Sequence, residues 1–328
     1  MRFAVDTGGT FTDLVIEDSK GKLHIFKSPT TPENPVEGIL SAFDRASENF
    51  SISSYDLLSK GEFLLHGTTR ATNAIVTSGT AKTAFLTTLG HPDILVLREG
   101  GRTEPFNFSI PFPEPYIPRS LTFEVLERIS AQGQIITPLD KNSLLKIINH
   151  LKEKKIESIA VCLLWSSVNP LHEREIGEIL DKKMPNIPYT LSHELNPVLR
   201  EYRRASSTCI DASLKPLMTE YILNLQDKLK ERGFQGRLLM LTSKGGVMDY
   251  KEIASAPIHT VGSGPAMAPI AGRYFAKVDA KSSTAIVADT GGTTYDVSLV
   301  RNGEIPMTPE TWLGDKYRGN ILGFSSVD

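Results

Sequence analysis

An eight-residue motif occurs twice in this chain, and each copy lies between two short apolar segments. The first copy is Asp6-Thr7-Gly8-Gly9-Thr10-Phe11-Thr12-Asp13, and the second is Asp289-Thr290-Gly291-Gly292-Thr293-Thr294-Tyr295-Asp296. Six of the eight positions are identical, although the copies begin 283 residues apart. The flanking apolar segments are 3–5 and 14–16 for the first copy, and 286–288 and 297–300 for the second. A glycine pair between apolar runs predicts a β-hairpin, so we expect two hairpins with the same tip.

The residue types at both tips favour a polyphosphate bound together with a divalent cation. We expect the N–H groups of each glycine pair to face phosphate oxygens, with threonine hydroxyls as further donors. Carboxylates there would repel phosphate unless a cation lay between them, which points to Mg²⁺ held by Asp6 and Asp289 largely through water. The other predicted nucleotide-binding residues are Thr7, Gly8, Gly9, Thr10, Thr12, Asp13, Thr290, Gly291, Gly292, Thr293, Thr294 and Asp296. The alternative is that each motif is only a tight turn.

Short β-rich runs alternate with longer helical patterns along the rest of the chain, which predicts an α/β fold. A third strand over 23–26 would extend the first hairpin. Further strands are predicted over 63–65, 158–164 and 238–241. Helical spacing of apolar residues predicts helices starting at Pro35 and running over 141–154, 170–183 and 202–232, the last bent or split at Pro216.

Composition and charge exclude several classes of protein. The chain has 328 residues with 40% apolar side chains, which is ordinary globular usage and enough for about two domains. A net charge of -2, without any basic run, argues against a nucleic-acid partner. No apolar window is long enough for a signal peptide or a membrane span. Cys162 and Cys209 form no CxxC pair, so we expect a reducing, cytoplasmic setting.

The paired hairpins resemble the two phosphate-binding loops of the actin, hexokinase and Hsp70-like ATPase superfamily. The resemblance narrows to the hydantoinase A and 5-oxoprolinase family, and it extends along the whole chain. Besides the two hairpin motifs it rests on four segments: HGTTRATNA over 66–74, NPLHE over 169–173, EYRRASST over 201–208 and GSGPA over 262–266. One departure is Met267, which stands where the family more often has a glycine.

The resemblance implies actin-like (ribonuclease H-like) ATPase lobes with an inserted α/β region. A hydantoinase/oxoprolinase N-terminal region over 1–200 would carry the first phosphate hairpin, and the start of a hydantoinase A-type region over 201–328 would carry the second. It also implies that the second ATPase lobe is incomplete, since the family continues past the segment over 323–328. We therefore expect residues from about 285 onward to pack incompletely or against another copy. The 328 residues alone should then show weak nucleotide binding and no substrate-stimulated ATPase activity.

The activity that the resemblance implies is ATP-dependent chemistry at a carbonyl group. MgATP would be used to phosphorylate an amide or enolate oxygen of a cyclic imide, lactam or ketone, with hydrolysis or carboxylation to follow. A hydantoinase B-like subunit is the implied partner, and a homo-oligomer stays open. The alternative function is an ATP-driven conformational switch that activates a partner enzyme, because the same ATPase fold also serves that purpose.

Two further places have both a functional and a structural interpretation. His66 follows a predicted strand, where it could face the substrate as a catalytic hydrogen-bond donor or proton carrier. A lone histidine with a structural role is the alternative. Ser263 and Gly264 precede a helical stretch, so their N–H groups could bind an anion. Gly-Pro is also ordinary sequence for the start of a helix.

Overall fold

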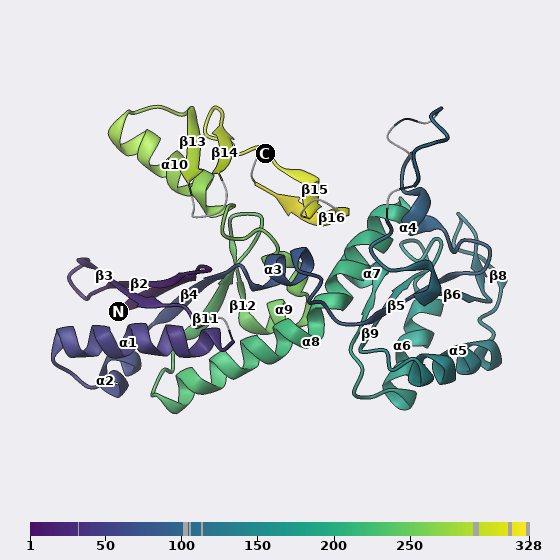
Figure 1. The fold of residues 1–328 in the computed structure, drawn as a ribbon, viewed down its shortest axis with the longest axis horizontal. Coiled ribbons are helices and arrows are strands. Elements are labelled where there is room, and N and C mark those ends of the chain that lie inside the picture. Colours follow the sequence, from purple (N-terminus) through teal and green to yellow (C-terminus); the bar gives the residue numbers. More distant parts are fainter. Residues whose placement is uncertain are drawn as a thin grey trace. The chain divides into compact units, whose positions relative to one another are not determined.

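The computed structural model describes residues 1–31, 33–100, 104, 106–112, 114–290, 295–313 and 317–325, and it divides into two compact units (Figure 1). Unit 1 comprises Met1–Asn73, Met218–Pro309 and Gly323–Asp328, and unit 2 comprises Ala74–Leu217 and Glu310–Leu322. Helix α8 (Glu201–Glu231) runs from unit 2 into unit 1 as one helix, with Pro216 inside it and no split. The predicted division at residue 200 falls inside unit 2, immediately before this helix.

A six-stranded sheet forms the centre of unit 1, in the order β12-β11-β4-β1-β2-β3. Strands β1, β2 and β3 pair antiparallel in sequence order, and so do β11 and β12. Strand β4 pairs parallel to both β1 and β11. The strands are β1 (Arg2–Thr7), β2 (Phe11–Glu17), β3 (Leu23–Pro29), β4 (Phe63–Thr68), β11 (Arg237–Leu241) and β12 (Val247–Asp249). All but β12 lie where the sequence predicts strands, which confirms the α/β interpretation for this unit.

Helices cover one face of this sheet (Figure 1). Helix α1 (Pro35–Phe50) starts at the predicted proline and buries Val36, Ile39, Leu40 and Phe43, which recur at helical spacing. Phe43 packs edge-on against Phe3 of β1, with ring centroids 5.2 Å apart. The other helical segments that begin in unit 1 are α2 (Ser54–Ser59), α3 (Arg70–Val76), α9 (Tyr250–Ser255), the 3-10 helix η2 (Pro257–Thr260) and α10 (Met267–Asp279).

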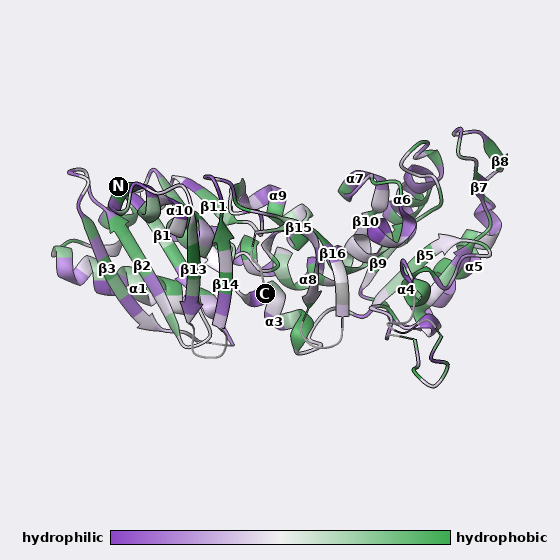
Figure 2. Cartoon of the chain, turned by 90° about the horizontal axis from the view of Figure 1, so that it is seen from above, coloured by the Kyte–Doolittle hydropathy of each residue, from purple (hydrophilic) through white to green (hydrophobic). Residues whose placement is uncertain are grey.

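The second predicted hairpin is present and has the same register as the first. Strands β13 (Ala285–Thr290) and β14 (Tyr295–Val300) pair antiparallel with Asp289 opposite Asp296, just as Asp6 is opposite Asp13. Its tip, residues 291–294, lies outside the described residues. Ile286 is 77% exposed and Tyr295 is 65% exposed, whereas Val300, Leu313 and Ile321 are buried. The predicted incomplete packing is therefore seen on the two strands of this hairpin but not at these later residues. Figure 2 shows hydrophobic stretches in green on both β13 and β14.

Unit 2 is built on a parallel four-stranded sheet in the order β10-β9-β5-β6. Both faces of this sheet are buried, since Leu86 and Val161 belong to one apolar cluster while Phe85 and Cys162 belong to another. Its elements are β5 (Thr83–Thr88), α4 (Ile94–Leu97), η1 (Arg119–Leu121), β6 (Thr122–Val125), β7 (Arg128–Ile129), β8 (Ile135–Thr137), α5 (Lys141–Glu153), β9 (Ser158–Cys162), α6 (Leu171–Lys183), β10 (Tyr189–Leu191) and α7 (Ser192–Leu195).

Two local features of unit 2 follow directly from its sequence. Helix α5 starts where it does because the Asp140 carboxylate accepts hydrogen bonds from the N–H groups of Asn142 and Ser143. Strands β15 (Thr308–Leu313) and β16 (Tyr317–Phe324) pair with each other and lie mainly in this unit.

None of the helices in the described residues has the length and apolar character that crossing a membrane requires.

A close backbone approach beside β11 gives a test of this packing. A Cβ atom at Gly236 would lie 2.5 Å from the carbonyl oxygen of Gly61 and 2.6 Å from that of Glu62. We expect Gly236→Ala to lower the free energy of unfolding by about 2 kcal/mol or more, because the two backbone segments must separate. Denaturant titration measures the change.

The matched control is Gly246→Ala. Its Cβ would meet nothing closer than Thr242 Oγ1 at 3.8 Å. The control should therefore change the free energy of unfolding by less than about 0.5 kcal/mol. Similar losses for the two alanine variants would contradict the close approach at Gly236.

Candidate functional site

Asp6 lies near the end of β1, between strands that both constrain it. It is paired with Asp13 on β2 and with Gly67 on β4. A Cβ atom at Gly67 would lie 3.0 Å from Asp6 Oδ1 and 3.0 Å from Leu241 Cδ1. Gly67 therefore leaves the space that the Asp6 carboxylate occupies. Sequence reasoning did not assign this role to Gly67, although a glycine inside a predicted strand signals a close approach.

Negative charge from both hairpins surrounds Asp6. Loss of hydration raises the pKa of Asp6 above its usual value, and repulsion from Asp13 and Asp289 raises it further. The Asp6 side chain is exposed to solvent, but the protein packed around it removes part of its hydration. Asp13 has a cation partner, because Lys27 Nζ lies 3.2 Å from its Oδ1. The structure thus brings the predicted metal-binding acids Asp6 and Asp289 close enough to repel each other.

The oxygen ligands at this place suit Mg²⁺ better than a metal that needs a full protein cage. Among the residues that the structure describes, no three or more His, Cys, Asp and Glu side chains are grouped so as to hold a metal ion. Mg²⁺ is usually bound by one or two carboxylates, and it completes its shell with water and phosphate oxygens. Asp6 and Asp289 fit that pattern, and a divalent cation would relieve their repulsion.

The tip of the first hairpin is shaped by hydrogen bonds from within the chain. Gly8 N–H donates to the carbonyl oxygen of Phe11 at 3.0 Å, so the prediction that both glycine N–H groups face a ligand is wrong for Gly8. Thr30 also stabilises the tip, because its hydroxyl donates to the carbonyl oxygen of Gly8 at 2.9 Å. A Cβ atom at Gly9 would meet nothing within 4 Å. The open approach to this tip is therefore at Gly9.

The predicted threonines divide into a buried pair and an exposed pair. Thr7 and Thr12 are buried, and Thr12 Oγ1 shares a hydrogen bond of 3.1 Å with Thr30 Oγ1. Thr10 and Thr290 are exposed, which leaves their side chains accessible to a ligand. The predicted residues Gly291, Gly292, Thr293 and Thr294 lie outside the described residues, and their role stays a prediction.

His66 lies on the face of the sheet that the helices cover. It is 0% exposed, with Nε2 2.7 Å from the Tyr221 hydroxyl and Nδ1 3.4 Å from the carbonyl oxygen of Val5. Burial lowers the pKa of His66 to about 4, so the ring is neutral at pH 7. Val5 and His66 are in register on parallel strands and share a face, whereas Asp6 points to the other face. This placement favours the structural interpretation of His66.

Ser263 and Gly264 lie next to the HGTTRATNA segment, which is far away in the sequence. Ser263 is buried and its hydroxyl donates to the carbonyl oxygen of Thr68 at 3.4 Å. The N–H group of Gly262 donates to Thr72 Oγ1 at 2.9 Å. Sequence reasoning identified both segments but not this contact. The Ser263 side chain is therefore used to join two motifs, while a Cβ atom at Gly264 would meet only Thr69 at 4.0 Å.

Comparison with known proteins matches the whole chain to parts of longer ones. Two family models match: the hydantoinase/oxoprolinase N-terminal region over residues 2–184, and hydantoinase/oxoprolinase over residues 204–327. The uncharacterized protein MJ0964 of Methanocaldococcus jannaschii is 37% identical over 325 residues, which are 98% of this chain and 46% of that protein. The acetophenone carboxylase gamma subunit of Aromatoleum aromaticum is 32% identical over 338 residues, 98% of this chain and 45% of that subunit.

A solved structure confirms the expected fold. The crystal structure of ATP-dependent caprolactamase from Pseudomonas jessenii matches with a TM-score of 0.87 and 28% identity. The match covers 100% of this chain and 47% of that chain. This chain therefore spans about half the length of the relatives that it matches.

The raised pKa of Asp6, caused first by loss of hydration and then by repulsion, predicts an unusual effect of removing its charge. A carboxyl group whose pKa is higher in the folded than in the unfolded chain destabilises the fold as the pH rises through that pKa. We therefore expect Asp6→Asn to raise the thermal midpoint at pH 7 without divalent cations. In acid, where the Asp6 carboxyl group is protonated and as neutral as the asparagine that replaces it, the gain should vanish. Scanning calorimetry at several pH values measures it.

Asp18→Asn is the control, with the same change of charge and the opposite sign expected. Hydrogen bonds from His24 and from the N–H groups of Lys22 and Lys20 lower the pKa of Asp18 to about 2. Its ionised form therefore stabilises the fold above that pH, and the asparagine variant should lower the midpoint at pH 7. A lower midpoint for Asp6→Asn as well would contradict the raised pKa of Asp6.

Proposed function

Because the chain belongs to the hydantoinase/oxoprolinase family, we propose that it forms part of an enzyme that uses MgATP to phosphorylate an amide or enolate oxygen of a cyclic imide, lactam or ketone. Phosphorylation turns a carbonyl oxygen into a leaving group, so a stable ring or ketone becomes reactive. Hydrolysis or carboxylation completes the reaction. Both outcomes occur in the names of relatives, a caprolactamase and an acetophenone carboxylase.

The observation that carries this proposal is the convergence of two acid-bearing hairpins in unit 1. Asp6 and Asp289 occupy the same register position in their hairpins, each opposite a second aspartate. Their mutual repulsion has a cost that a bound divalent cation would remove. Asp6 and Asp289 would hold Mg²⁺, and the bound MgATP would supply the phosphoryl group.

The remaining residues of the first tip bind and orient in this proposal. The exposed Thr10 hydroxyl and the open backbone at Gly9 contact phosphate oxygens. Thr12 and Thr30 hold the tip in shape, so that its donors need little rearrangement when phosphate arrives. Lys27 neutralises Asp13, which keeps that second carboxylate from adding to the repulsion of phosphate. The duplicated sequence assigns the same roles to residues 290–294 and Asp296.

A partner subunit and a cytoplasmic setting belong to the same proposal. The acetophenone carboxylase relative is named as a gamma subunit, which supports assembly with another chain. We propose a hydantoinase B-like subunit as that chain. The two cysteines, Cys162 and Cys209, are both buried free thiols, in keeping with a reducing compartment.

ATP turnover by the full-length protein, with the proposed partner subunit added, tests the reaction class. Substrates for this test are hydantoins, lactams including 5-oxoproline, and alkyl or aryl ketones. Stimulation by one of these small molecules supports the enzyme. Stimulation by the partner alone, with none from any small molecule, would instead favour an ATP-driven conformational switch.

The two aspartates of the second hairpin should differ in their contribution to MgATP binding. In the full-length protein we expect Asp289→Ala to weaken Mg²⁺-dependent ATP binding by about tenfold or more, and Asp296→Ala to weaken it less. Asp289 leads directly into the glycine tip, whereas Asp296 begins the returning strand. Calorimetric titration of ATP with and without Mg²⁺ measures both.

Asp18→Ala serves as the control for this titration, because Asp18 lies in the turn between β2 and β3. It should bind MgATP as the unchanged chain does. Equal losses for Asp289→Ala and Asp296→Ala would count against the ranking. A loss that is the same without Mg²⁺ would rule out Asp289 as a metal ligand.

A further inference from the structure

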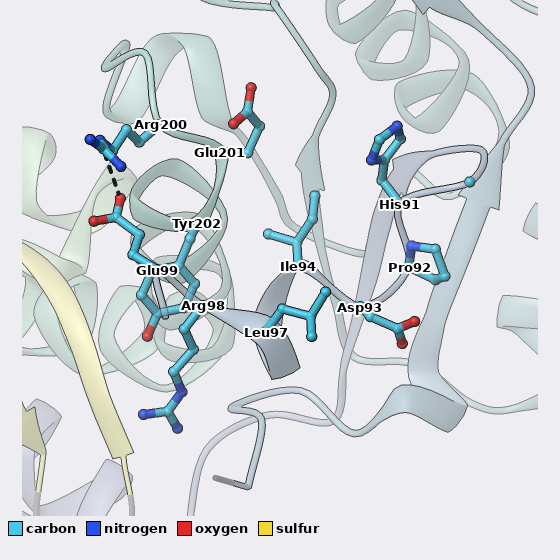
Figure 3. A pocket seen from close by; sticks show the side chains of 11 residues that line it. His91, Pro92, Asp93, Ile94, Leu97, Arg98, Glu99, Arg200, Glu201 and Tyr202 are labelled. Carbon is cyan, nitrogen blue, oxygen red and sulfur yellow. Dashed lines mark ion pairs between the residues drawn. The ribbon is translucent and has the colours of Figure 1, made fainter. Parts of the chain in front are cut away.

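A cavity of about 370 Å³ lies in unit 2, and the residues that line it come from two distant parts of the sequence (Figure 3). One wall is the segment that follows β5, and the other is the start of α8. The volume is in the range of about 300–1,000 Å³ that is usual for pockets that bind small molecules. This cavity contains none of the residues assigned above to the nucleotide or the metal.

The position of the cavity in the sheet is one at which α/β proteins bind ligands. Every strand pairing in this sheet is parallel, and β5 lies between β6 and β9. The chain passes from β5 to β6 on one side and then to β9 on the other, so β5 marks the point at which the strand order reverses. Ligands in open parallel sheets bind beyond the carboxyl ends of the strands at such a point.

Two of the acids in the cavity wall already have a cation partner. Arg203 binds Glu99 with two hydrogen bonds, of 2.9 Å and 3.0 Å. Asp93 pairs with Arg119 at 3.0 Å. Neither carboxylate therefore needs a charge supplied by a ligand.

Three charged side chains of the wall remain: Arg98, which donates to the carbonyl oxygen of Glu114 at 3.0 Å, and the neighbours Arg200 and Glu201. Arg200 is 68% exposed, and its Nε lies 3.9 Å from Glu99 Oε1, beyond hydrogen-bond distance, on a carboxylate that Arg203 already holds. Within the described ranges, the Glu201 carboxylate makes no hydrogen bond or ion pair with another side chain. Arg200 thus has only a long ion pair, to a carboxylate that it shares with Arg203, and beside it Glu201 has no ion pair among the described residues. This part of the wall therefore offers a weakly engaged cation next to an anion.

Two apolar side chains lie in the middle of the cavity wall. Figure 3 shows Ile94 and Leu97 there, with Arg98 on one side and Asp93 on the other. Leu97 is 53% exposed, so its side chain is accessible to a ligand. A ligand that fits here has an apolar portion besides its two charges.

The frame of the cavity is fixed by buried hydrogen bonds. Arg204 is 0% exposed and donates to the carbonyl oxygens of Val198 and Leu199, before α8, and of Leu163, after β9. Leu163 N–H in turn donates to the buried Glu173 carboxylate at 2.9 Å. The start of α8 is therefore held against the end of the sheet, and Arg200 and Glu201 are presented from a rigid base.

From these observations we infer that the cavity binds a small free amino acid with an apolar side chain. Arg200 pairs with its carboxylate, which also lies near the first turn of α8, where the helix dipole favours negative charge. Glu201 accepts hydrogen bonds from its ammonium group, and Ile94 and Leu97 contact its side chain. The site requires both charges of the zwitterion, and it is independent of the proposed nucleotide chemistry.

Calorimetric titration with L-leucine as the probe, without nucleotide, tests this inference. Isocaproate, which lacks the ammonium group, and isoamylamine, which lacks the carboxylate, are titrated in parallel. We expect binding of leucine at millimolar concentration or below, and binding of each analogue at least about tenfold weaker, since each loses one charge-assisted interaction. Binding of either analogue as tight as that of leucine, or no binding of leucine, would overturn the inference.

Charge-removing variants test the location. Arg200→Gln and Glu201→Gln should each weaken leucine binding by about tenfold or more, whereas Arg174→Gln, at an exposed position on α6, should not change it. Unchanged thermal midpoints would show that the glutamine variants remain folded. Leucine binding that survives both cavity substitutions would place the ligand elsewhere and refute the site. Since no ATP is present, either outcome leaves the proposed function untouched.

Discussion

The parallel pairing of β1 with β4 is the constraint on which the rest of unit 1 depends. It sets Val5 beside His66 and Asp6 beside Gly67. Because side chains alternate along a strand, the first pair faces the helices and the second faces the opposite side. The same register therefore gives the apolar core a buried histidine bonded to Tyr221 and gives the site a carboxylate with room beside it.

Electrostatic repulsion distinguishes the two hairpins from ordinary turns. A tight turn with a glycine pair does not need an aspartate on each strand. Here loss of hydration, together with repulsion from Asp13 and Asp289, raises the pKa of Asp6 in the first hairpin. The fold stabilises this arrangement elsewhere, through packing such as that of Phe3 on Phe43 and through the hydrogen bonds of Thr30. A carboxyl group with a raised pKa in an accessible place is typical of a binding site, because a bound cation can supply the positive charge that the protein does not provide there.

Unit 2 follows a different principle, since its site is made by hydrogen bonds to backbone oxygens rather than by a duplicated motif. Arg204 belongs to the EYRRASST segment, on which the resemblance to the family partly rests. It is buried and holds the segment before α8 against the end of β9. Arg200 and Glu201 next to it remain accessible, so one short segment supplies both the anchor and the charged groups.

The sequence by itself determined the elements whose cause is local. The two hairpins, helix α1 and most strands of unit 1 follow from turn residues, a starting proline and apolar spacing, all of which act within a few residues. The register of a strand with a distant neighbour is not local, and it decided that His66 faces the core and that Gly67 adjoins Asp6. Only the tertiary structure brought Ser263 to Thr68, turned the Gly8 N–H group into the turn, and joined the end of β5 to the start of α8. These outcomes depend on how separate elements pack, and the same residue types would satisfy several other pairings.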